Sequence, residues 1–441
     1  MPLSKEDVLR KIKDNDVKYT RLWFTDILGQ LKGMTITLSE IENVLDDGQG
    51  FDGSSIEGFV RIEESDLMAW PDLDTFRIFP WDLGGEKVAM MFCDIKNPDG
   101  TPYDGDPRYC LRRTLKKATD QGLTFYVGPE LEYFYFKDSK NPETMDTGGY
   151  FDYSTVDVGV RMRKKTVKFL EQIGVPVECS HHEVANSQHE IDLQYKDALR
   201  MADSVQIYRL IVKEVAQHAG HYATFMPKPL FGQNGSGMHV HQSLFRGDKN
   251  IFFAPGNDYN LSDEAKQYVA GLLKHVKGFA LVTNQWVNSY KRLVPGYEAP
   301  CYISWGRRNR SSLVRVPMYR AGKEKAVRVE LRSPDPACNP YLAFSVMLAA
   351  GLKGIDEKMT LVPPVEENIF HMSSEETEER QIDILPRSLS AAIEEAEQSE
   401  LLKQTLGDHM FTSFIANKKV EWDNYRVHVH RYELDKYLPM L

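Results

Sequence analysis

Three short segments of this chain alternate apolar side chains with charged or imidazole side chains at every second position. The polar residues that share this phase in PELEYF, GMHVHQS and RVELR are Glu130, Glu132, His239, His241, Arg328, Glu330 and Arg332. Because successive side chains of a strand point to opposite faces, each segment is expected to be a strand with one apolar and one polar face. Like charges side by side on a strand are unfavourable without a counter-charge. The polar face therefore indicates a binding site, and the alternative for any one segment is a strand that faces solvent.

Strand-like and helical patterns follow one another irregularly along the rest of the chain. Strand-like runs include residues 17–28, 30–38, 75–81, 87–95, 123–136, 223–229, 237–245 and 326–334. Helical patterns start after Ser4 and also cover residues 161–173, 262–283, 341–356 and most of the chain after Pro386. The absence of strict βαβ order predicts an α+β fold with a mainly antiparallel sheet. The polar segment HHEVANSQHE is expected to be irregular, and SSEETEER is expected to be a solvated loop.

A stretch dense in turn-forming residues, Asn97 to Pro107, reads NPDGTPYDGDP and predicts a domain boundary. Asp106 is placed to cap a new helix with Pro107 at its first position, and Gly122 is placed to end it. The expected domains are residues 1–105 and residues 106–441.

Composition excludes several classes of protein. The chain of 441 residues has a formal net charge of −10 and no basic stripe, which argues against a nucleic-acid partner. Its five cysteines are scattered and form no CxxC pair, as is typical of reduced thiols in a cytoplasmic protein. The polar N-terminus does not resemble a signal peptide, and no apolar stretch is long enough for a membrane span.

The candidate site is rich in carboxylates, poor in nitrogen ligands and free of thiolates. Such a set suits the hard cations Mg²⁺ or Mn²⁺ better than zinc. Nearby arginines, among them Arg292, Arg310 and Arg315, would supply planar donors for phosphate or carboxylate groups. There is no P-loop, no kinase motif set and no GxGxxG fingerprint. The residues by themselves therefore predict a metal-dependent enzyme that acts on phosphate or carboxylate substrates.

Eight ordered motifs carry a resemblance to a known family over essentially the whole chain. They are FDGSSIEGF, ESDL, PELEYF, HHEVANSQHEIDL, NGSGMHVHQS, NSYKRLVPGYEAP, RRNRS and RVELRSPDPACNPYLAF. In these motifs the chain resembles type I glutamine synthetases, which use ATP to join ammonia to the side-chain carboxylate of glutamate through γ-glutamyl phosphate. The resemblance implies a small N-terminal β-grasp-like domain, a large catalytic domain with an antiparallel sheet, and a homo-dodecamer of two stacked hexamers with active sites between subunits.

The resemblance also assigns roles to residues. By similarity, two or more divalent cations per site would be held by Glu132, Glu183 and Glu190 and by Glu130, His239 and Glu330. Glutamate would contact Asn234, Gly235, Arg292, Glu298, Arg310 and Arg332. ATP would contact Glu178, His241, Gln242, Ser243, Arg310, Arg315, Lys325 and Arg328.

For the second half of the reaction, the resemblance implies an ammonium site made of Asp52, Ser55 (with Ser54 nearby), Tyr150 and Glu183. Asp52 would come from the adjacent subunit; taken alone, it reads equally well as an Asx-type turn. Glu298 would belong to a flap that shields the intermediate from water. Asp52, Glu298 and Arg310 are the expected catalytic residues.

One departure from many family members concerns control. Phe370 stands in ENIFHMSSEE where those members carry a tyrosine that is adenylylated, so the chain resembles the shorter, non-adenylylated subtype. Arg61 and Glu421 match positions linked to glutamine feedback, with an exposed loop arginine and an ordinary helix carboxylate as the alternative.

Two other functions remain open at this point. A relative that ligates a polyamine or ethanolamine would keep the metal ligands but change the ammonium pocket, whereas an inactive regulatory homologue would lose metal ligands. A regulatory protein partner could coexist with catalysis, and neither a nucleic acid nor a membrane is expected as a partner.

Overall fold

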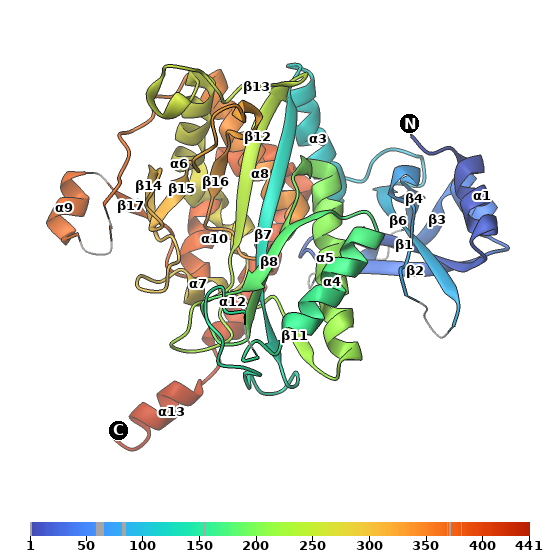
Figure 1. Cartoon of the computed structure of the whole chain (residues 1–441), viewed down its shortest axis with the longest axis horizontal. Helices are drawn as coiled ribbons and strands as arrows, with labels where there is room; N and C mark the ends of the chain where they lie inside the picture. Colours follow the sequence, from blue (N-terminus) through green and yellow to red (C-terminus); the bar gives the residue numbers. More distant parts are fainter. Residues whose placement is uncertain are drawn as a thin grey trace.

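The structure, a computed structural model, describes residues 2–58, 66–81, 85–153, 155–367, 369, 372–380 and 382–441. Two β-sheets form the N-terminal part and the larger remainder of the chain (Figure 1). A smaller hydrophobic core lies within the N-terminal part, and the larger core also takes in residues of the N-terminal sheet such as Trp23 and Phe92. Most strand pairs are antiparallel; the pairs β1–β6 and β14–β15 are parallel. This arrangement confirms the predicted α+β class.

The N-terminal part is a six-stranded sheet in the order β2-β1-β6-β4-β3, with β5 paired to β6. Its elements are α1 (Lys5–Asp14), β1 (Val17–Thr25), β2 (Leu31–Thr37), α2 (Ile41–Asp47), β3 (Gln49–Asp52), β4 (Asp66–Pro71), β5 (Arg77–Ile78) and β6 (Lys87–Lys96). Ser4 caps α1 as predicted: its hydroxyl accepts from the Asp7 amide at 3.2 Å, and the Asp7 carboxylate accepts from the Ser4 amide at 3.1 Å. Val8 and Ile12 of α1 are buried in the core of this part.

The larger part is an eleven-stranded sheet in the order β17-β14-β15-β16-β12-β7-β9-β8, with β10 and β11 paired to β7 and β13 paired to β12. Its strands are β7 (Thr124–Phe136), β8 (Val177–His182), β9 (Gln188–Leu193), β10 (Lys196–Asp197), β11 (Tyr222–Thr224), β12 (Met238–Arg246), β13 (Lys249–Asn250), β14 (Tyr302–Gly306), β15 (Ser312–Arg315), β16 (Val329–Leu331) and β17 (Asp383–Ile384).

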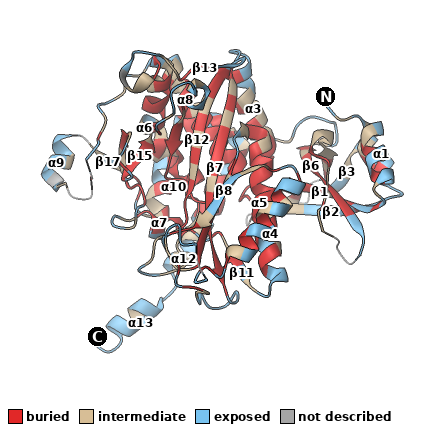
Figure 2. Cartoon of the chain, viewed as in Figure 1, coloured by how far each residue is buried: buried red, intermediate tan, exposed pale blue. Residues whose placement is uncertain are grey.

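Helices cover one face of this sheet. The helices of this part are α3 (Pro107–Thr119), α4 (Val160–Gln172), α5 (Ala198–His218), α6 (Asp263–Thr283), α7 (Ser289–Arg292), α8 (Pro340–Asp356), α9 (Ser374–Glu379), α10 (Leu389–Glu397), α11 (Glu400–Leu406), α12 (Asp408–Arg426) and α13 (Arg431–Tyr437). Helices α3 and α5 pack on β7, α6 packs on β14 and β15, and α8 packs on α3, α5 and α6. Figure 2 shows the resulting buried interior, with α9 and α13 exposed at the periphery. Within the described part of the chain, no helix is both long and apolar enough to cross a membrane.

Some of the local predictions from the sequence were confirmed and others were wrong. Asp106 caps α3 by accepting from the Arg108 amide at 2.9 Å, with Pro107 at the first position, as predicted. Two expectations need correction. HHEVANSQHE is irregular only in its middle, residues 183–187, because its two ends belong to the paired strands β8 and β9. SSEETEER contains helix α9, which the Ser373 hydroxyl caps by accepting from the Glu376 amide at 3.1 Å. The long helix α5 was not predicted; its buried residues include Asp203, Gln206 and Arg209, so the polar residues of this segment do not mark an exposed face. The division of the chain at residues 105 and 106 stays a prediction.

A buried ion cluster joins the two parts. Arg108 of α3 donates to Asp203 of α5 at 3.0 Å and to Asp72, which follows β4, at 2.7 Å, and it also pairs with Asp94 of β6. Burial would raise the pKa of Asp72, but Arg108 and Arg200 hold it below its usual range. One guanidinium therefore ties carboxylates of the N-terminal sheet to a carboxylate of helix α5 in the larger part.

Replacing this guanidinium should destabilise the protein. Arg108→Met removes the fully buried cationic partner of Asp203, Asp72 and Asp94, and breaking a buried ion pair in this way typically costs about 3–5 kcal/mol. The matched control, Arg10→Met, breaks an ion pair with Asp7 whose arginine side chain is 66% exposed, so a loss under about 1 kcal/mol is expected. Urea unfolding of both variants measures the difference; similar losses would contradict the assignment.

Candidate active site

Strand register brings the predicted polar residues onto one face of the large sheet. Glu130 of β7 lies opposite His239 of β12 and opposite Asp192 of β9. Two residues further along β7, Glu132 lies opposite Glu190 of β9. The residues between them, such as Leu131, are buried on the helical side. The period-two pattern therefore predicted this face correctly.

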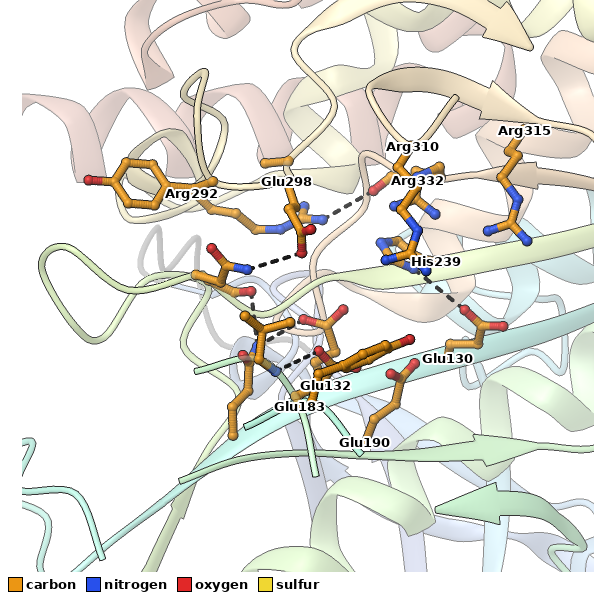
Figure 3. Close-up of a pocket in the computed structure, with 17 residues that line it drawn as sticks. Glu130, Glu132, Glu183, Glu190, His239, Arg292, Glu298, Arg310, Arg315 and Arg332 are labelled. Carbon is orange, nitrogen blue, oxygen red and sulfur yellow. Dashed lines mark hydrogen bonds and ion pairs between the residues drawn. The ribbon is translucent and has the colours of Figure 1, made fainter. Parts of the chain in front are cut away.

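The polar face forms the wall of a cavity (Figure 3). Its lining residues are Glu130, Glu132, Tyr150, Glu183, Val184, Gln188, Glu190, Asn234, Gly235, His239, Arg292, Tyr297, Glu298, Ala299, Arg310, Arg315 and Arg332. Figure 3 shows Glu132, Glu183 and Glu190 together on one side, with Arg292, Arg310, Arg315 and Arg332 on the other. The cavity thus offers sites for cations and anions close together.

Glu130, His239 and Glu330 form a candidate metal group, since one ligand atom from each lies within 4.8 Å of the others. The Nδ1 atom of His239 lies 3.5 Å from a Glu130 oxygen and 3.7 Å from a Glu330 oxygen. Burial, together with Arg332, lowers the pKa of His239 to about 4, so its imidazole is neutral and can serve as a ligand.

Glu330 is fully buried and is balanced by two arginines. Arg332 contacts one of its oxygens at 2.7 Å and Arg315 contacts the other at 3.2 Å. Burial by itself would raise the pKa of Glu330, but Arg332 and the neighbouring histidines hold it below its usual value. This carboxylate is therefore ionised.

Glu132, Glu183 and Glu190 make up a second acidic group on the same cavity. Glu132 accepts from the Gln188 side chain and from the Gly237 amide, each at 2.9 Å. Burial, followed by repulsion from Glu183, raises the pKa of Glu132 to about 8, and burial with repulsion from Glu132 raises the pKa of Glu190 strongly. Here carboxylates outnumber nearby cationic groups, which is the condition that a bound divalent cation would relieve.

The structure adds one residue to the second group. His181 of β8 lies 3.5 Å from Glu183 and 3.3 Å from Glu190, and the three ligand atoms form a further candidate metal group. The sequence interpretation missed His181 because its segment was taken as irregular. Strand alternation within β8 could have found it.

The predicted glutamate-binding residues Asn234, Gly235, Arg292, Glu298, Arg310 and Arg332 all line this cavity. Asn234 donates to Glu298 at 3.2 Å. Glu298 has a φ of 56°, an uncommon backbone conformation for a residue other than glycine, and it lies next to the exposed turn at Gly296. Gly235 admits no larger residue, because a Cβ there would lie 2.3 Å from the Pro227 carbonyl oxygen.

Arg292 is largely engaged with the protein itself. Its guanidinium donates to the carbonyls of Ser333 at 2.7 Å and of Arg332 at 3.1 Å. It therefore also fixes the backbone that carries Arg332.

A neighbouring cavity of about 250 Å³ collects most of the predicted ATP-binding residues. Glu178, His241, Gln242, Ser243, Lys325 and Arg328 line it, whereas Arg310 and Arg315 line the first cavity. Tyr126 and Tyr195, which were not predicted, supply aromatic walls suited to a planar base. Glu130 lines both cavities, so the two are adjacent.

The predicted ammonium residues do not all meet within one chain. Tyr150 and Glu183 line the first cavity, and the Tyr150 ring lies 5.9 Å below Arg310. Asp52 is at the end of β3 in the N-terminal sheet, where its carboxylate accepts from the Ser54 amide at 2.9 Å in an Asx turn. Ser54 and Ser55 line a separate cavity beside Trp286. Within a single chain, Asp52 and Ser55 therefore lie together but outside the cavity that Tyr150 and Glu183 line.

Comparison with known proteins identifies the chain. Residues 16–98 match the family model "Glutamine synthetase, beta-Grasp domain", and residues 104–437 match "Glutamine synthetase, catalytic domain". The chain belongs to the glutamine synthetase family. It is 51% identical to a glutamine synthetase of Mycolicibacterium smegmatis, with 100% of both chains covered. It is 50% identical to one of Methanosarcina mazei, covering 99% of this chain and 98% of the relative.

Solved structures agree with this membership. Plasmodium falciparum glutamine synthetase superposes with a TM-score of 0.89 at 27% identity, covering 99% of each chain. GmaS in complex with ADP superposes with a TM-score of 0.88 at 29% identity, covering 98% of this chain and 99% of that one. Membership in the family implies the use of ATP and a divalent metal, and the two acidic groups fit such a cation.

Of the two residues considered for regulation, the structure describes only Glu421. Arg61, like Phe370, lies outside the described residues. Glu421 of α12 accepts from the Val287 amide at 3.0 Å and from the buried Lys418 ammonium at 2.8 Å. It lines a third cavity, which is bordered by Trp286 and α5. A regulatory role for either residue stays a prediction.

Binding of a divalent cation to this protein should release protons. Without a cation, Glu132, with its pKa raised to about 8, holds a proton at neutral pH, and a bound cation must displace that proton. Mn²⁺ affinity should therefore rise with pH until the pH passes that value, by up to about tenfold per unit for each proton released.

Equilibrium dialysis with Mn²⁺ at several pH values, together with measured proton release, tests this expectation. Glu132→Gln cannot hold the proton and should give weaker binding with a shallower pH dependence. An affinity that does not change with pH in the unaltered protein would contradict the prediction.

Proposed function

We propose that this chain joins ammonia to the side-chain carboxylate of L-glutamate, with ATP as co-substrate, to give L-glutamine, ADP and phosphate through γ-glutamyl phosphate. The observation that carries the proposal is the adjacency of three sets of residues around Glu130: the acidic groups, the arginines and the second cavity with its tyrosines. Relatives named glutamine synthetase that are 50% and 51% identical over the whole chain support it.

Two divalent cations, Mg²⁺ or Mn²⁺, would be held by Glu130, His239 and Glu330 and by Glu132, Glu183 and Glu190. When bound, they would neutralise phosphate charge and align the phosphates of ATP. The raised pKa of Glu132, about 8, supports the need for a cation in the second group.

The protein's own residues would position the substrates and balance charge. Asn234, Gly235 and Arg292 would hold glutamate, with the Gly235 backbone close to the ligand because no Cβ intervenes. Arg310, Arg315 and Arg332 lie across the cavity from the acidic groups and would offset charge on the phosphoryl group as it moves to the glutamate carboxylate. Glu178, His241, Gln242, Ser243, Lys325 and Arg328 would hold the nucleotide; the related GmaS has been solved with ADP.

In the second step, ammonia attacks the acyl phosphate. Ammonium must first lose a proton, and a carboxylate is the group that can bind the cation and take that proton. We assign this role to Asp52 from a neighbouring subunit, with Ser55, Tyr150 and Glu183 completing the site. Glu298, in its exposed loop with Gly296, would close over the intermediate and exclude water.

The assembly proposed is a homo-dodecamer of two stacked hexamers. The position of Asp52, outside the cavity of its own chain, supports a site shared between subunits. The exposed apolar side chains of the C-terminal segment, including Tyr432, Leu438 and Leu441, also favour a partner surface. Five free cysteines support a reducing, cytoplasmic location.

The first prediction concerns which amine the protein uses. Phosphate release from ATP with glutamate and Mg²⁺ should depend on ammonium, with glutamine formed in equal amount. Asp52→Ala should lower this activity by at least about 100-fold, the usual contribution of a general base. The control Asp99→Ala removes a comparable Asx turn, in which Asp99 accepts from the Thr101 amide at 2.9 Å, and should keep full activity.

Other outcomes of this assay point to other functions. Turnover with polyamines or ethanolamine but not with ammonium would indicate a γ-glutamyl-amine ligase and would overturn the assignment of the ammonium site. Binding of metal and ATP without turnover on any amine would indicate a regulatory homologue.

Mixed oligomers test whether the site is shared. Asp52→Ala and Glu330→Gln should each be inactive alone, because each removes one half of a composite site. When the two variants are co-expressed, random assembly of a symmetric oligomer should restore up to about a quarter of the native activity. Activity that stays at the level of the single variants would place Asp52 and Glu330 in the same subunit's site.

A further inference from the structure

The polar face of the large sheet continues past β9 onto the edge strand β8. Cys179 of β8 lies opposite Asp192 of β9, in the same register as Glu130 and His239. His181, two residues on, points to the same face of β8. One ligand atom from each of Cys179, His181 and Asp192 lies within 4.8 Å of the others.

The three residues carry features of a binding site. The Cys179 thiol donates to an Asp192 oxygen at 2.7 Å. The other Asp192 oxygen is buried and has no hydrogen-bond partner. The ring of Phe151 stacks on His181, with centroids 4.4 Å apart, and restricts its orientation. Cys179 is the exposed member of the five cysteines, so a solute can reach it.

A comparison within the same molecule shows why this group can take a cation. Asp146, Asp157, His182 and His189 also cluster and are buried. There Arg163 already supplies the positive charge, donating to Asp157 at 2.7 Å and contacting His189 at 2.8 Å. Among the described residues, no arginine or lysine forms a hydrogen bond or ion pair with Cys179, His181 or Asp192.

We propose that Cys179, His181 and Asp192 form a further site for a borderline or soft divalent cation such as Zn²⁺ or Cd²⁺, in which His181 turns from Glu183 and Glu190 to this ion, and that its occupancy inhibits the enzyme. A thiolate, an imidazole and a carboxylate with one open position match the ligand preferences of these ions, whereas Mg²⁺ favours oxygen ligands alone. On binding, the thiol proton leaves to solvent and a metal–sulfur bond forms, with no change in oxidation state.

Inhibition follows from the position of the site. Asp192 lines the cavity assigned to the nucleotide, and so does Glu178, the residue before Cys179. Asp192 also lies opposite Glu130. A cation held there would occupy the edge of the nucleotide cavity and repel a cation bound by Glu130. Inhibition should therefore be competitive with ATP; this part of the inference rests on the proposed function.

Cd²⁺ is the probe for the site. Full-length protein saturated with Mg²⁺ should bind Cd²⁺ with an ultraviolet thiolate-to-metal charge-transfer band. Cys179→Ser should abolish the band, and the control Cys301→Ser, which alters a buried thiol, should keep it. Asp192→Asn should retain the thiol but weaken Cd²⁺ affinity by at least about tenfold, the loss seen even for outer partners of a metal ligand.

Measurements of enzyme activity provide a second test of the proposed site. Cd²⁺ should raise the apparent KM for ATP in the native enzyme but not in Cys179→Ser, whose Mg²⁺-dependent activity should be unchanged. A missing band, or one that persists in Cys179→Ser, overturns the site. Inhibition that persists unchanged in Cys179→Ser overturns the inhibitory role, because Cd²⁺ then acts by replacing Mg²⁺ among the glutamates. The band reports on the site even if no amine supports turnover, so failure of the proposed function is distinguishable.

Discussion

The register of β12, β7, β9 and β8 is the constraint on which the rest of the structure depends. Because side chains alternate along a strand, one alignment of these strands brings Glu130, Glu132, Glu190, Asp192, His181 and His239 to one face and apolar residues such as Leu131, Ile191 and Val240 to the other. A slip of one residue between β7 and β12 would bring His239 toward the helices and Met238 toward the cavity. Packing of α3 and α5 against the apolar face therefore also secures the geometry of the polar face.

The two acidic groups differ in their electrostatic balance. Glu330 has Arg332 and Arg315 within ion-pair distance, and its pKa is low despite complete burial. Glu132 and Glu190 mainly face other carboxylates, and their pKa values are raised. The first group is therefore already organised in the folded chain, whereas the second is incomplete until a cation arrives. This difference arises from the neighbours of each glutamate, since Arg332 directly follows β16 and Arg315 ends the adjacent β15, whereas β9 contains no arginine.

The sequence predicted those parts of the molecule in which local pattern and environment agree. Alternation in β7, β12 and β16 was enough to place Glu130, His239 and Glu330 on a common face. The helix caps at Ser4 and Asp106 could be predicted because capping depends only on neighbouring residues. Helix α5 was missed because polar residues such as Asp203, Gln206 and Arg209 are buried in it, so its sequence does not separate a buried apolar face from an exposed polar face.

Other features could not be predicted because they depend on distant residues. His181 gains its role only from pairing between β8 and β9, and its polar neighbours concealed the strand. The cluster around Arg108 unites residues from four separate segments. No pattern within one chain could have revealed the partners proposed for Asp52, since Tyr150 and Glu183 line a cavity that Asp52 of the same chain does not reach.

The two oxygens of Glu130 face different histidines. One lies 2.6 Å from His241, in the nucleotide cavity, and the other lies 3.5 Å from His239, in the metal group. A single carboxylate thus forms part of two binding sites. Any ligand that draws this group toward one histidine changes the free energy of binding at the other. By thermodynamic reciprocity, the factor by which nucleotide changes metal affinity must equal the factor by which metal changes nucleotide affinity.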